Sequence, residues 1–173
     1  FTAAKSPVPR GEGRRRILLA EGDATARNIL WRMFTRTNYS VDCAESGLEA
    51  VAMCENGAYD LVLMDVHLPG LEGFDAARSI RQGERERGFY IPIVVMSGHS
   101  FEDVEQGFLA ACMDAYIPKP VDFKRILLVI GQILGQEPGV ATLAGENGLE
   151  EGAKPAWGPA LAAGTGANSC LWH

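Results

Sequence analysis

Residues 59–81 read YDLVLMDVHLPGLEGFDAARSIR, and this stretch decides the fold class. Residues 61–64 form a short, continuous apolar run, which is typical of a strand buried on both faces of a parallel sheet. The run ends at Asp65, a carboxylate that would be costly to bury without a partner. Residues 72–82 follow with the apolar spacing of a helix. A buried strand, a carboxylate and a helix in this order predict one repeat of an α/β sheet.

The same alternation of strand and helix runs through residues 16–135. Short runs rich in Val, Ile and Leu predict further strands at residues 17–20, 41–44, 91–96 and 115–117. Five strands alternating with five helices predict an α/β fold with a doubly wound, five-stranded parallel sheet and helices on both faces.

Apolar residues between these strands recur at helical spacing, and we expect them in the core. The stripes are Leu30, Met33 and Phe34; Leu48, Val51 and Ala52; Phe74, Ala77 and Ile80; Phe101, Val104 and Phe108; and Phe123, Ile126, Leu127, Ile130, Ile133 and Leu134.

The rest of the 173 residues is too short for an ordinary second domain. Residues 1–15 carry prolines, glycines and clustered charge, which predicts a linker. Residues 136–173 are rich in Gly, Ala, Pro and Glu and poor in large apolar side chains, which predicts a disordered tail.

Composition narrows the partners and the compartment. A net charge of -6 argues against non-specific nucleic-acid binding, and no helix-turn-helix pattern follows the domain, so we expect no direct contact with nucleic acid. The four cysteines lack the spacing of a zinc site and favour a reducing, cytoplasmic compartment. No apolar run reaches the roughly 20 residues of a transmembrane helix, so we expect no membrane contact by this segment.

Polar side chains follow the ends of four predicted strands. They are Glu21 and Asp23 after the first strand, Asp65 after the third, Ser97 after the fourth, and Lys119 after the fifth. In a doubly wound sheet the carboxyl ends of the strands meet at one edge, where ligands bind. Each residue also has an ordinary structural interpretation: Asp23 as a helix N-cap, Ser97 as a turn residue and Lys119 as a solvated charge.

As a set, these residues have a chemical interpretation. Clustered carboxylates attract a hard dication, and Mg²⁺ needs only one or two of them because it keeps several waters. An aspartate can act as a nucleophile toward phosphorus and form an aspartyl-phosphate. Lys119 and Ser97 would then supply positive charge and a hydroxyl to the phosphoryl oxygens.

Four stretches carry a family resemblance: RILLAEGDATAR, YDLVLMDVHLPGLEGFDAARSIR, IPIVVMSGHS and MDAYIPKP. In this order, over roughly residues 15–135, they resemble the signature stretches of the receiver domains of two-component response regulators. The resemblance implies a flavodoxin-like sheet of the receiver type and a phosphoacceptor function with Mg²⁺ as cofactor.

The resemblance also implies residue roles. Asp65 corresponds to the phosphorylated aspartate, and Glu21 to the first member of an acidic pair that holds Mg²⁺ together with Asp65 and the backbone carbonyl of His67. Ser97 corresponds to the switch hydroxyl and Lys119 to the lysine that contacts the phosphoryl group. The bond from Lys119 to Pro120 is cis in similar domains, and Tyr116 occupies the aromatic position that moves inward with the hydroxyl.

The chain departs from the family pattern at Gly22. Receivers usually carry two adjacent acids here, and the missing second acid is the direct metal ligand in similar domains. Asp23 is the next residue, and the backbone freedom of Gly22 could re-aim its side chain toward the metal. The change should weaken Mg²⁺ binding and leave the fold intact.

Two histidines lie near these positions. We expect His67 and His99 to be exposed loop residues rather than side-chain ligands, because a hard Mg²⁺ site favours oxygen.

Three functions remain open on the sequence. The first is a phosphoacceptor that receives its phosphoryl group from a histidine kinase or a histidine phosphotransfer domain. Phosphorylation would then remodel the face formed by the fourth and fifth helices. The domain could also dimerise through this face. The second is a degenerate receiver that acts as a phosphorylation-independent interaction module, which Gly22 favours. The third, an enzyme in its own right, is disfavoured because the chain has no phosphate-binding loop, no nucleophile elbow, and His67 where aspartate-dependent phosphatases carry a second Asp.

The first residue is Phe1 rather than Met, and a Pro-containing linker follows it. Together with the MDAYIPKP segment, which resembles hybrid-kinase receivers, this favours the C-terminal receiver of a hybrid sensor histidine kinase over a stand-alone receiver.

Overall fold

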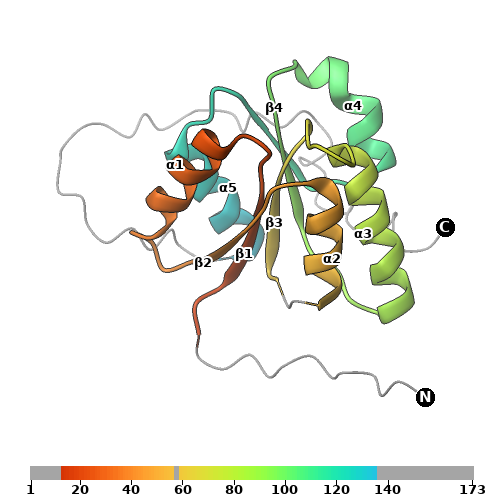
Figure 1. Ribbon diagram of the computed structural model, residues 1–173, viewed down its shortest axis with the longest axis horizontal. Helices are drawn as coiled ribbons and strands as arrows, with labels where there is room; N and C mark the ends of the chain where they lie inside the picture. The colour runs from red at the N-terminus through yellow and green to blue at the C-terminus, as the bar shows by residue number, and fades with distance from the viewer. Residues whose placement is uncertain (1–12, 57–58, 136–173) are drawn as a thin grey trace.

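The computed structural model describes residues 13–56 and 59–135 (Figure 1). The predicted tail and all but the end of the predicted linker lie outside these residues. Within them, five parallel strands form one sheet in the order β2-β1-β3-β4-β5. The strands are β1 (Arg16–Ala20), β2 (Ser40–Ala44), β3 (Leu61–Asp65), β4 (Ile93–Ser97) and β5 (Ala115–Pro118). This order confirms the predicted doubly wound α/β fold.

Five helices connect the strands and cover both faces of the sheet: α1 (Ala24–Phe34), α2 (Gly47–Asn56), α3 (Gly73–Arg87), α4 (Phe101–Ala110) and α5 (Phe123–Leu134). Helices α1 and α5 lie on one face, and α2, α3 and α4 lie on the other (Figure 1). Every residue of β3 is buried because it is the middle strand. Leu61 and Leu63 face the α1–α5 layer, while Val62 and Met64 face the other layer. The continuous apolar run in the sequence therefore has a partner on each face.

The expected inner face of α2 was wrong. Leu48 is 62% exposed, and the side chains that α2 buries are Ala50 and Cys54. Small residues at these positions let α2 pack closely against Ala76 and Ala77 on α3. The α2 sequence is apolar on more than one side, so spacing alone did not distinguish the face that α3 covers. Met33 on α1 and Ala52 on α2 are also exposed. All other residues of the predicted stripes are buried or half-buried.

Gly73 allows α3 to begin against the end of β3. A Cβ at this position would lie 2.2 Å from the backbone oxygen of Asp65, closer than any side chain tolerates. The backbone N–H of Gly73 donates to the carbonyl of Val66 at 2.8 Å. The absence of a side chain therefore holds the first turn of α3 on the segment that carries Asp65.

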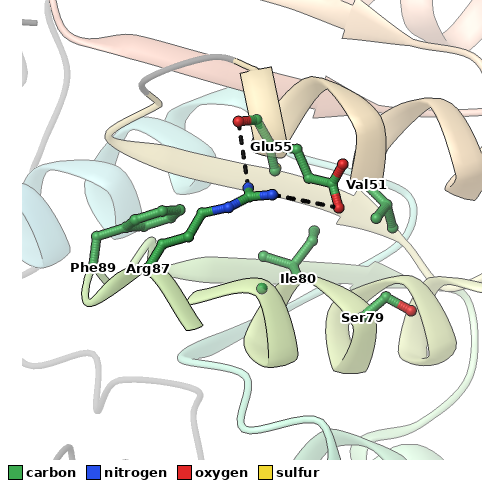
Figure 2. A pocket seen from close by; sticks show the side chains of 8 residues that line it. Val51, Glu55, Ser79, Ile80, Arg87 and Phe89 are labelled. Atoms are coloured by element: carbon green, nitrogen blue, oxygen red, sulfur yellow. Dashed lines mark hydrogen bonds and ion pairs between the residues drawn. The ribbon is translucent and has the colours of Figure 1, made fainter. Parts of the chain in front are cut away.

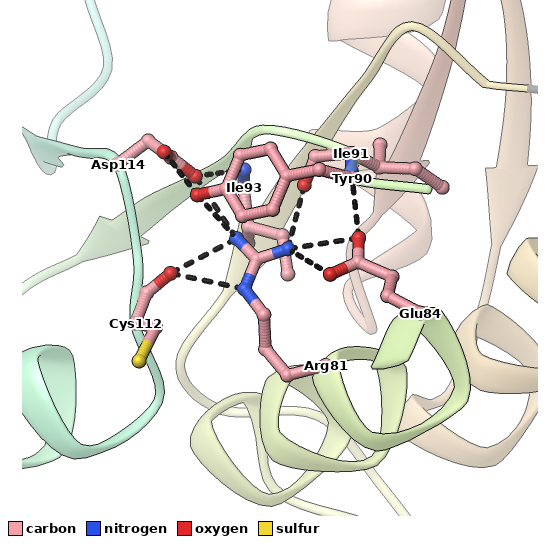
Figure 3. A network of polar contacts seen from close by, with 7 residues as sticks. All are labelled: Arg81, Glu84, Tyr90, Ile91, Ile93, Cys112 and Asp114. Carbon is pink, nitrogen blue, oxygen red and sulfur yellow. Dashed lines mark hydrogen bonds and ion pairs between the residues drawn. The ribbon is translucent and has the colours of Figure 1, made fainter. Parts of the chain in front are cut away.

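A buried cation joins three segments at the opposite edge of the sheet (Figure 3). The side chain of Arg81, on α3, is 6% exposed and lies between Glu84 and Asp114. Its Nη1 donates to both carboxylate oxygens of Glu84, at 2.9 and 2.8 Å, and its Nη2 donates to Asp114 Oδ2 at 3.0 Å. Tyr90 covers the guanidinium with its ring and donates its hydroxyl to Asp114. Remaining donors of Arg81 bond to the backbone carbonyls of Ile91 and Cys112.

The charges in this network are unequal. One guanidinium faces two carboxylates, so Glu84 and Asp114 together carry one excess negative charge. Burial raises the pKa of both carboxyl groups above the ordinary values of 4.5 and 3.8, because the loss of hydration outweighs the attraction of Arg81. Without Arg81, both carboxylates would be buried with no cation.

We expect Arg81→Met to lower the free energy of unfolding by roughly 3–5 kcal/mol, because it leaves buried carboxylates without a cation. Urea denaturation at neutral pH measures the loss. The matched control is Arg78→Met, since Arg78 lies on the same helix and pairs with Asp75 in solvent; its loss should stay below about 1 kcal/mol.

The Arg81→Met deficit should also shrink as the pH is lowered. A carboxyl group whose pKa is raised by folding takes up its proton more readily in the folded state, so acid favours folding until the pH falls to the unfolded value. Loss of Arg81 raises both pKa values further and widens this window. Equal deficits at neutral and mildly acidic pH would contradict the proposed cause.

Candidate functional site

Two carboxylates meet at the carboxyl ends of adjacent strands. Glu21 follows β1 directly, Asp65 ends β3, and these strands pair with Ala20 opposite Met64. Glu21 is 2% exposed and Asp65 is 5% exposed. Two carboxylates buried this close repel each other and are stable only with a cation between them.

The Lys119 ammonium supplies that cation. Its Nζ lies 2.7 Å from Asp65 Oδ2 and 3.0 Å from Glu21 Oε2. Lys119 follows β5, which is separated from β3 by β4, and its long side chain spans that distance. The Lys119–Pro120 peptide bond is cis. Burial by itself would lower the pKa of Lys119, but the hydrogen bonds to Asp65 and Glu21 outweigh it, and the pKa is raised.

The two oxygens of Asp65 have different partners. Oδ2 bonds to Lys119, while Oδ1 accepts a hydrogen bond from the backbone N–H of His67 at 3.2 Å. These two bonds hold the Asp65 carboxylate at a fixed orientation, as a nucleophilic carboxylate requires.

Ser97 and Tyr116 both bond to the backbone of His99, on the loop after β4. The Ser97 Oγ accepts a hydrogen bond from the backbone N–H of His99 at 3.1 Å. The Tyr116 hydroxyl donates to the backbone carbonyl of His99, and its ring is buried against Phe101. The backbone of one loop residue thus connects the hydroxyl that ends β4 with the aromatic ring on β5.

Asp23 caps α1. Its Oδ1 accepts a hydrogen bond from the backbone N–H of Ala26 at 2.7 Å, and its own N–H donates to Glu21 Oε1 at 3.0 Å. The capping interpretation is therefore confirmed, while a role for Asp23 as a metal ligand stays a prediction.

Gly22 lies directly against the loop that follows β3. A Cβ at this position would be 2.8 Å from Cδ of Pro69. Because a proline ring cannot swing aside as a flexible side chain does, a residue with a side chain at position 22 would displace the loop. The missing acid is thus accompanied by close packing of Gly22 on Pro69.

The donor set suits a hard cation better than a soft one. Among residues 13–56 and 59–135, no group of three or more His, Cys, Asp or Glu side chains is arranged to hold a metal ion. Mg²⁺ does not need such a group, because one or two carboxylates and a carbonyl suffice when water completes its shell. Glu21, Asp65 and the His67 carbonyl fit that requirement.

Comparison with known proteins identifies the family. Residues 17–131 match the model of the response regulator receiver domain. The chain belongs to the response regulator receiver family. Such receivers are the phosphoacceptor modules of two-component signalling.

This receiver is similar in sequence both to histidine kinases and to a transcriptional regulatory protein. The transcriptional regulatory protein ResD of Bacillus subtilis is 33% identical over 120 residues, which cover 69% of this chain and 48% of ResD. "Probable histidine kinase 1" of Oryza sativa subsp. indica is 28% identical over 159 residues, which cover 75% of this chain and 16% of the kinase. The receiver thus spans less than half the length of either relative.

Solved structures give the same family. The receiver domain of the sensor histidine kinase PA1611 from Pseudomonas aeruginosa, crystallised with a magnesium ion coordinated in its active site cleft, has a TM-score of 0.63 at 28% identity; the match covers 70% of this chain and 98% of that one. The receiver domain of Ssk1 from Saccharomyces cerevisiae, crystallised with the histidine phosphotransfer protein Ypd1, has a TM-score of 0.65 at 25% identity, with 69% and 88% covered.

A small pocket lies away from this site, between the C-terminal halves of α2 and α3 (Figure 2). Its lining residues are Val51, Cys54, Glu55, Ser79, Ile80, Gly83, Arg87 and Phe89. Arg87 donates to the backbone oxygen of Glu55 at 3.3 Å and also lies 3.8 Å from its carboxylate. The pocket contains none of the predicted site residues.

The helices of the described residues include none long and apolar enough to cross a membrane.

Sequence reasoning missed one contact near the site. His67 and His99 are exposed, as expected, but the two side chains touch, with 3.1 Å between their Nε2 atoms. Each histidine lies two residues beyond the polar side chain that ends a neighbouring strand, Asp65 on β3 and Ser97 on β4. The equal spacing of the two histidines from the ends of adjacent strands could have predicted this contact from the sequence.

Replacing Gly22 tests its role as a lost ligand. We expect Gly22→Asp to bind Mg²⁺ more tightly, because it adds a carboxylate beside Glu21. We also expect it to lower the free energy of unfolding by roughly 1–3 kcal/mol, because its Cβ overpacks Pro69. Calorimetric Mg²⁺ titration and urea denaturation measure the two effects. Gly22→Ala is the control: it should show a similar loss of stability without the gain in affinity. If Gly22→Asp binds Mg²⁺ no more tightly than Gly22→Ala, Gly22 does not mark a lost ligand.

Proposed function

We propose that this receiver accepts a phosphoryl group onto Asp65 from a phosphohistidine of a histidine kinase or a histidine phosphotransfer domain. The observation that carries the proposal is the buried Asp65 carboxylate, which ends β3 beside Glu21 and is bonded to Lys119. The co-crystal of the Ssk1 receiver with a phosphotransfer protein supports this class of partner.

In the transfer, a carboxylate oxygen of Asp65 forms a bond to phosphorus as the bond from phosphorus to the donor imidazole breaks. The imidazole keeps the electron pair of the broken bond and takes up a proton. Lys119 holds Asp65 in place before the reaction and contacts a phosphoryl oxygen afterwards. Ser97 donates its hydroxyl hydrogen to another phosphoryl oxygen, since its Oγ already accepts from His99.

We propose Mg²⁺ as the cofactor, held by Glu21, Asp65 and the His67 carbonyl, with Asp23 as a further candidate. Glu21 and Asp65 carry two negative charges, and Lys119 neutralises one of them. A phosphoryl group brings roughly two more negative charges. When bound, Mg²⁺ supplies the positive charge that lets the phosphoryl group enter this site.

The output is a change of surface. Ser97 and Tyr116 are the switch residues, and both are tied to the backbone of His99. Phosphorylation draws Ser97 toward the phosphoryl group and so biases the packing of the face formed by α4, β5 and α5. Leu109 on α4 and Leu128 on α5 are exposed large apolar residues, which suits a protein interface or a dimer that involves these helices.

The parent protein is a second part of the proposal. We infer that this receiver belongs to a hybrid histidine kinase in the cytoplasm, because it is 28% identical over 120 residues to a stretch that makes up 7% of hybrid signal transduction histidine kinase I of Dictyostelium discoideum. The receiver does not act as an enzyme by itself, and it makes no direct contact with nucleic acid or membrane.

One observation favours a second function. The usual second acid is replaced by Gly22, and Lys119 bonds to both Glu21 and Asp65. A degenerate receiver that binds its partner regardless of phosphorylation would have this arrangement.

Phosphorylation by a small donor separates the two functions. With Mg²⁺ and acetyl phosphate, we expect the intact mass to rise by a single phosphoryl group, because the Asp65 carboxylate is held in a fixed orientation by two hydrogen bonds. The adduct should require Mg²⁺, vanish in Asp65→Asn and persist in Asp75→Asn, which removes an exposed aspartate on α3. Absence of the adduct both with acetyl phosphate and with a phosphorylated histidine phosphotransfer domain would favour the degenerate module.

A further inference from the structure

Two histidine side chains contact each other on the loops that follow β3 and β4. His67 lies on the loop after β3, and His99 lies on the loop after β4. Their Nε2 atoms are 3.1 Å apart, and the rings meet edge to face with centroids 5.2 Å apart. Both rings are exposed, so an ion from solvent can reach the two nitrogens.

A carboxylate orients one of the rings. Glu72 Oε2 lies 3.5 Å from His67 Nδ1. Glu72 occupies the N-cap position of α3, yet its side chain makes no capping bond, so its carboxylate is available to the histidine. In the tautomer with the proton on Nδ1, beside Glu72, the lone pair of His67 Nε2 is free to bind a metal ion. A histidine held by a carboxylate in this way is the usual arrangement of a metal-binding imidazole.

We propose that His67 and His99 form a site for a transition-metal dication such as Zn²⁺, with the two Nε2 atoms as ligands and water completing the shell. Two nitrogens bound to one Zn²⁺ at about 2.0–2.1 Å, with an angle between 90° and tetrahedral, lie about 2.9–3.4 Å apart. The observed 3.1 Å falls within that range. Imidazole nitrogen suits Zn²⁺, Cu²⁺ and Ni²⁺ but not Mg²⁺, so this site is chemically distinct from the carboxylate site.

The bound ion would join the two loops that carry the phosphoacceptor and the switch. The His67 backbone N–H bonds to Asp65, and the His99 backbone bonds to both Ser97 and Tyr116. Linking the two rings therefore fixes the loop that contacts Asp65 relative to the loop that contacts the switch residues. Metal binding itself does not depend on phosphorylation.

Isothermal titration with ZnCl₂ tests the proposal on the full chain in excess Mg²⁺. We expect one Zn²⁺ per chain, with binding severely weakened in His67→Ala and in His99→Ala. Glu72→Gln should weaken it by roughly tenfold, because the carboxylate no longer orients His67. Two controls should keep wild-type affinity: His173→Ala, which removes the third histidine of the sequence, and Asp65→Asn, which alters the Mg²⁺ site.

A spectroscopic signature tests the same ligands independently of stability. Cu²⁺ bound to the wild-type chain should show nitrogen couplings from two imidazoles by electron paramagnetic resonance, and each single histidine variant should show one fewer. The proposal is overturned if the wild type binds no Zn²⁺, if both histidine variants bind it as tightly as the wild type, or if affinity falls in His173→Ala or Asp65→Asn instead. In that case the histidine pair is only a hydrogen-bonded contact between two loops.

Discussion

The hydrogen bonds from one ammonium group to two buried carboxylates hold the functional edge of this receiver together. Lys119 joins the ends of β1, β3 and β5 through Glu21 and Asp65. A parallel sheet brings these strand ends together, and two adjacent carboxylates would then repel each other in a region of low hydration. The amine offsets that repulsion without sealing the site, because Lys119 remains 30% exposed and reaches the carboxylates from the solvent side.

The opposite edge of the sheet has the same charge arrangement with a different outcome. Arg81 also lies between two carboxylates, Glu84 and Asp114, but its guanidinium is enclosed and its donors all have acceptors in the protein. Among the described residues, no buried side-chain nitrogen or oxygen lacks a hydrogen-bond partner. A planar guanidinium with five donors can close a network completely, whereas an ammonium with three donors on a flexible stem can be shared with a ligand. The network around Lys119 is therefore suited to chemistry, and the network around Arg81 is suited to stabilising the fold.

The sequence predicted the fold and the meeting of Glu21, Asp65 and Lys119, because both depend on short segments. The apolar run of β3 and the polar residue at each strand end were readable without knowledge of packing. Arg81 and Glu84 were missed because their charge suggested exposure, although they continue the buried stripe of Ala77 and Ile80 at helical spacing. The inner face of α2 and the contact of Gly22 with Pro69 depend on which segments the fold brings together, and no local pattern encodes that.

Gly22 changes the balance between the internal cation and an external one. In a receiver with two adjacent acids, the carboxylates outnumber the lysine by more, and a dication gains more from entering. Here Glu21 and Asp65 each have one oxygen bonded to Lys119, so part of their negative charge is already neutralised and Mg²⁺ gains less by binding them. Under the proposed function, the affinity of these two carboxylates for Mg²⁺ therefore sets how readily Asp65 is phosphorylated. A phosphoryl group favours the dication because it adds negative charge that a single ammonium cannot neutralise. The phosphodonor and Mg²⁺ should therefore bind this site with positive cooperativity, each supplying the charge that the other requires.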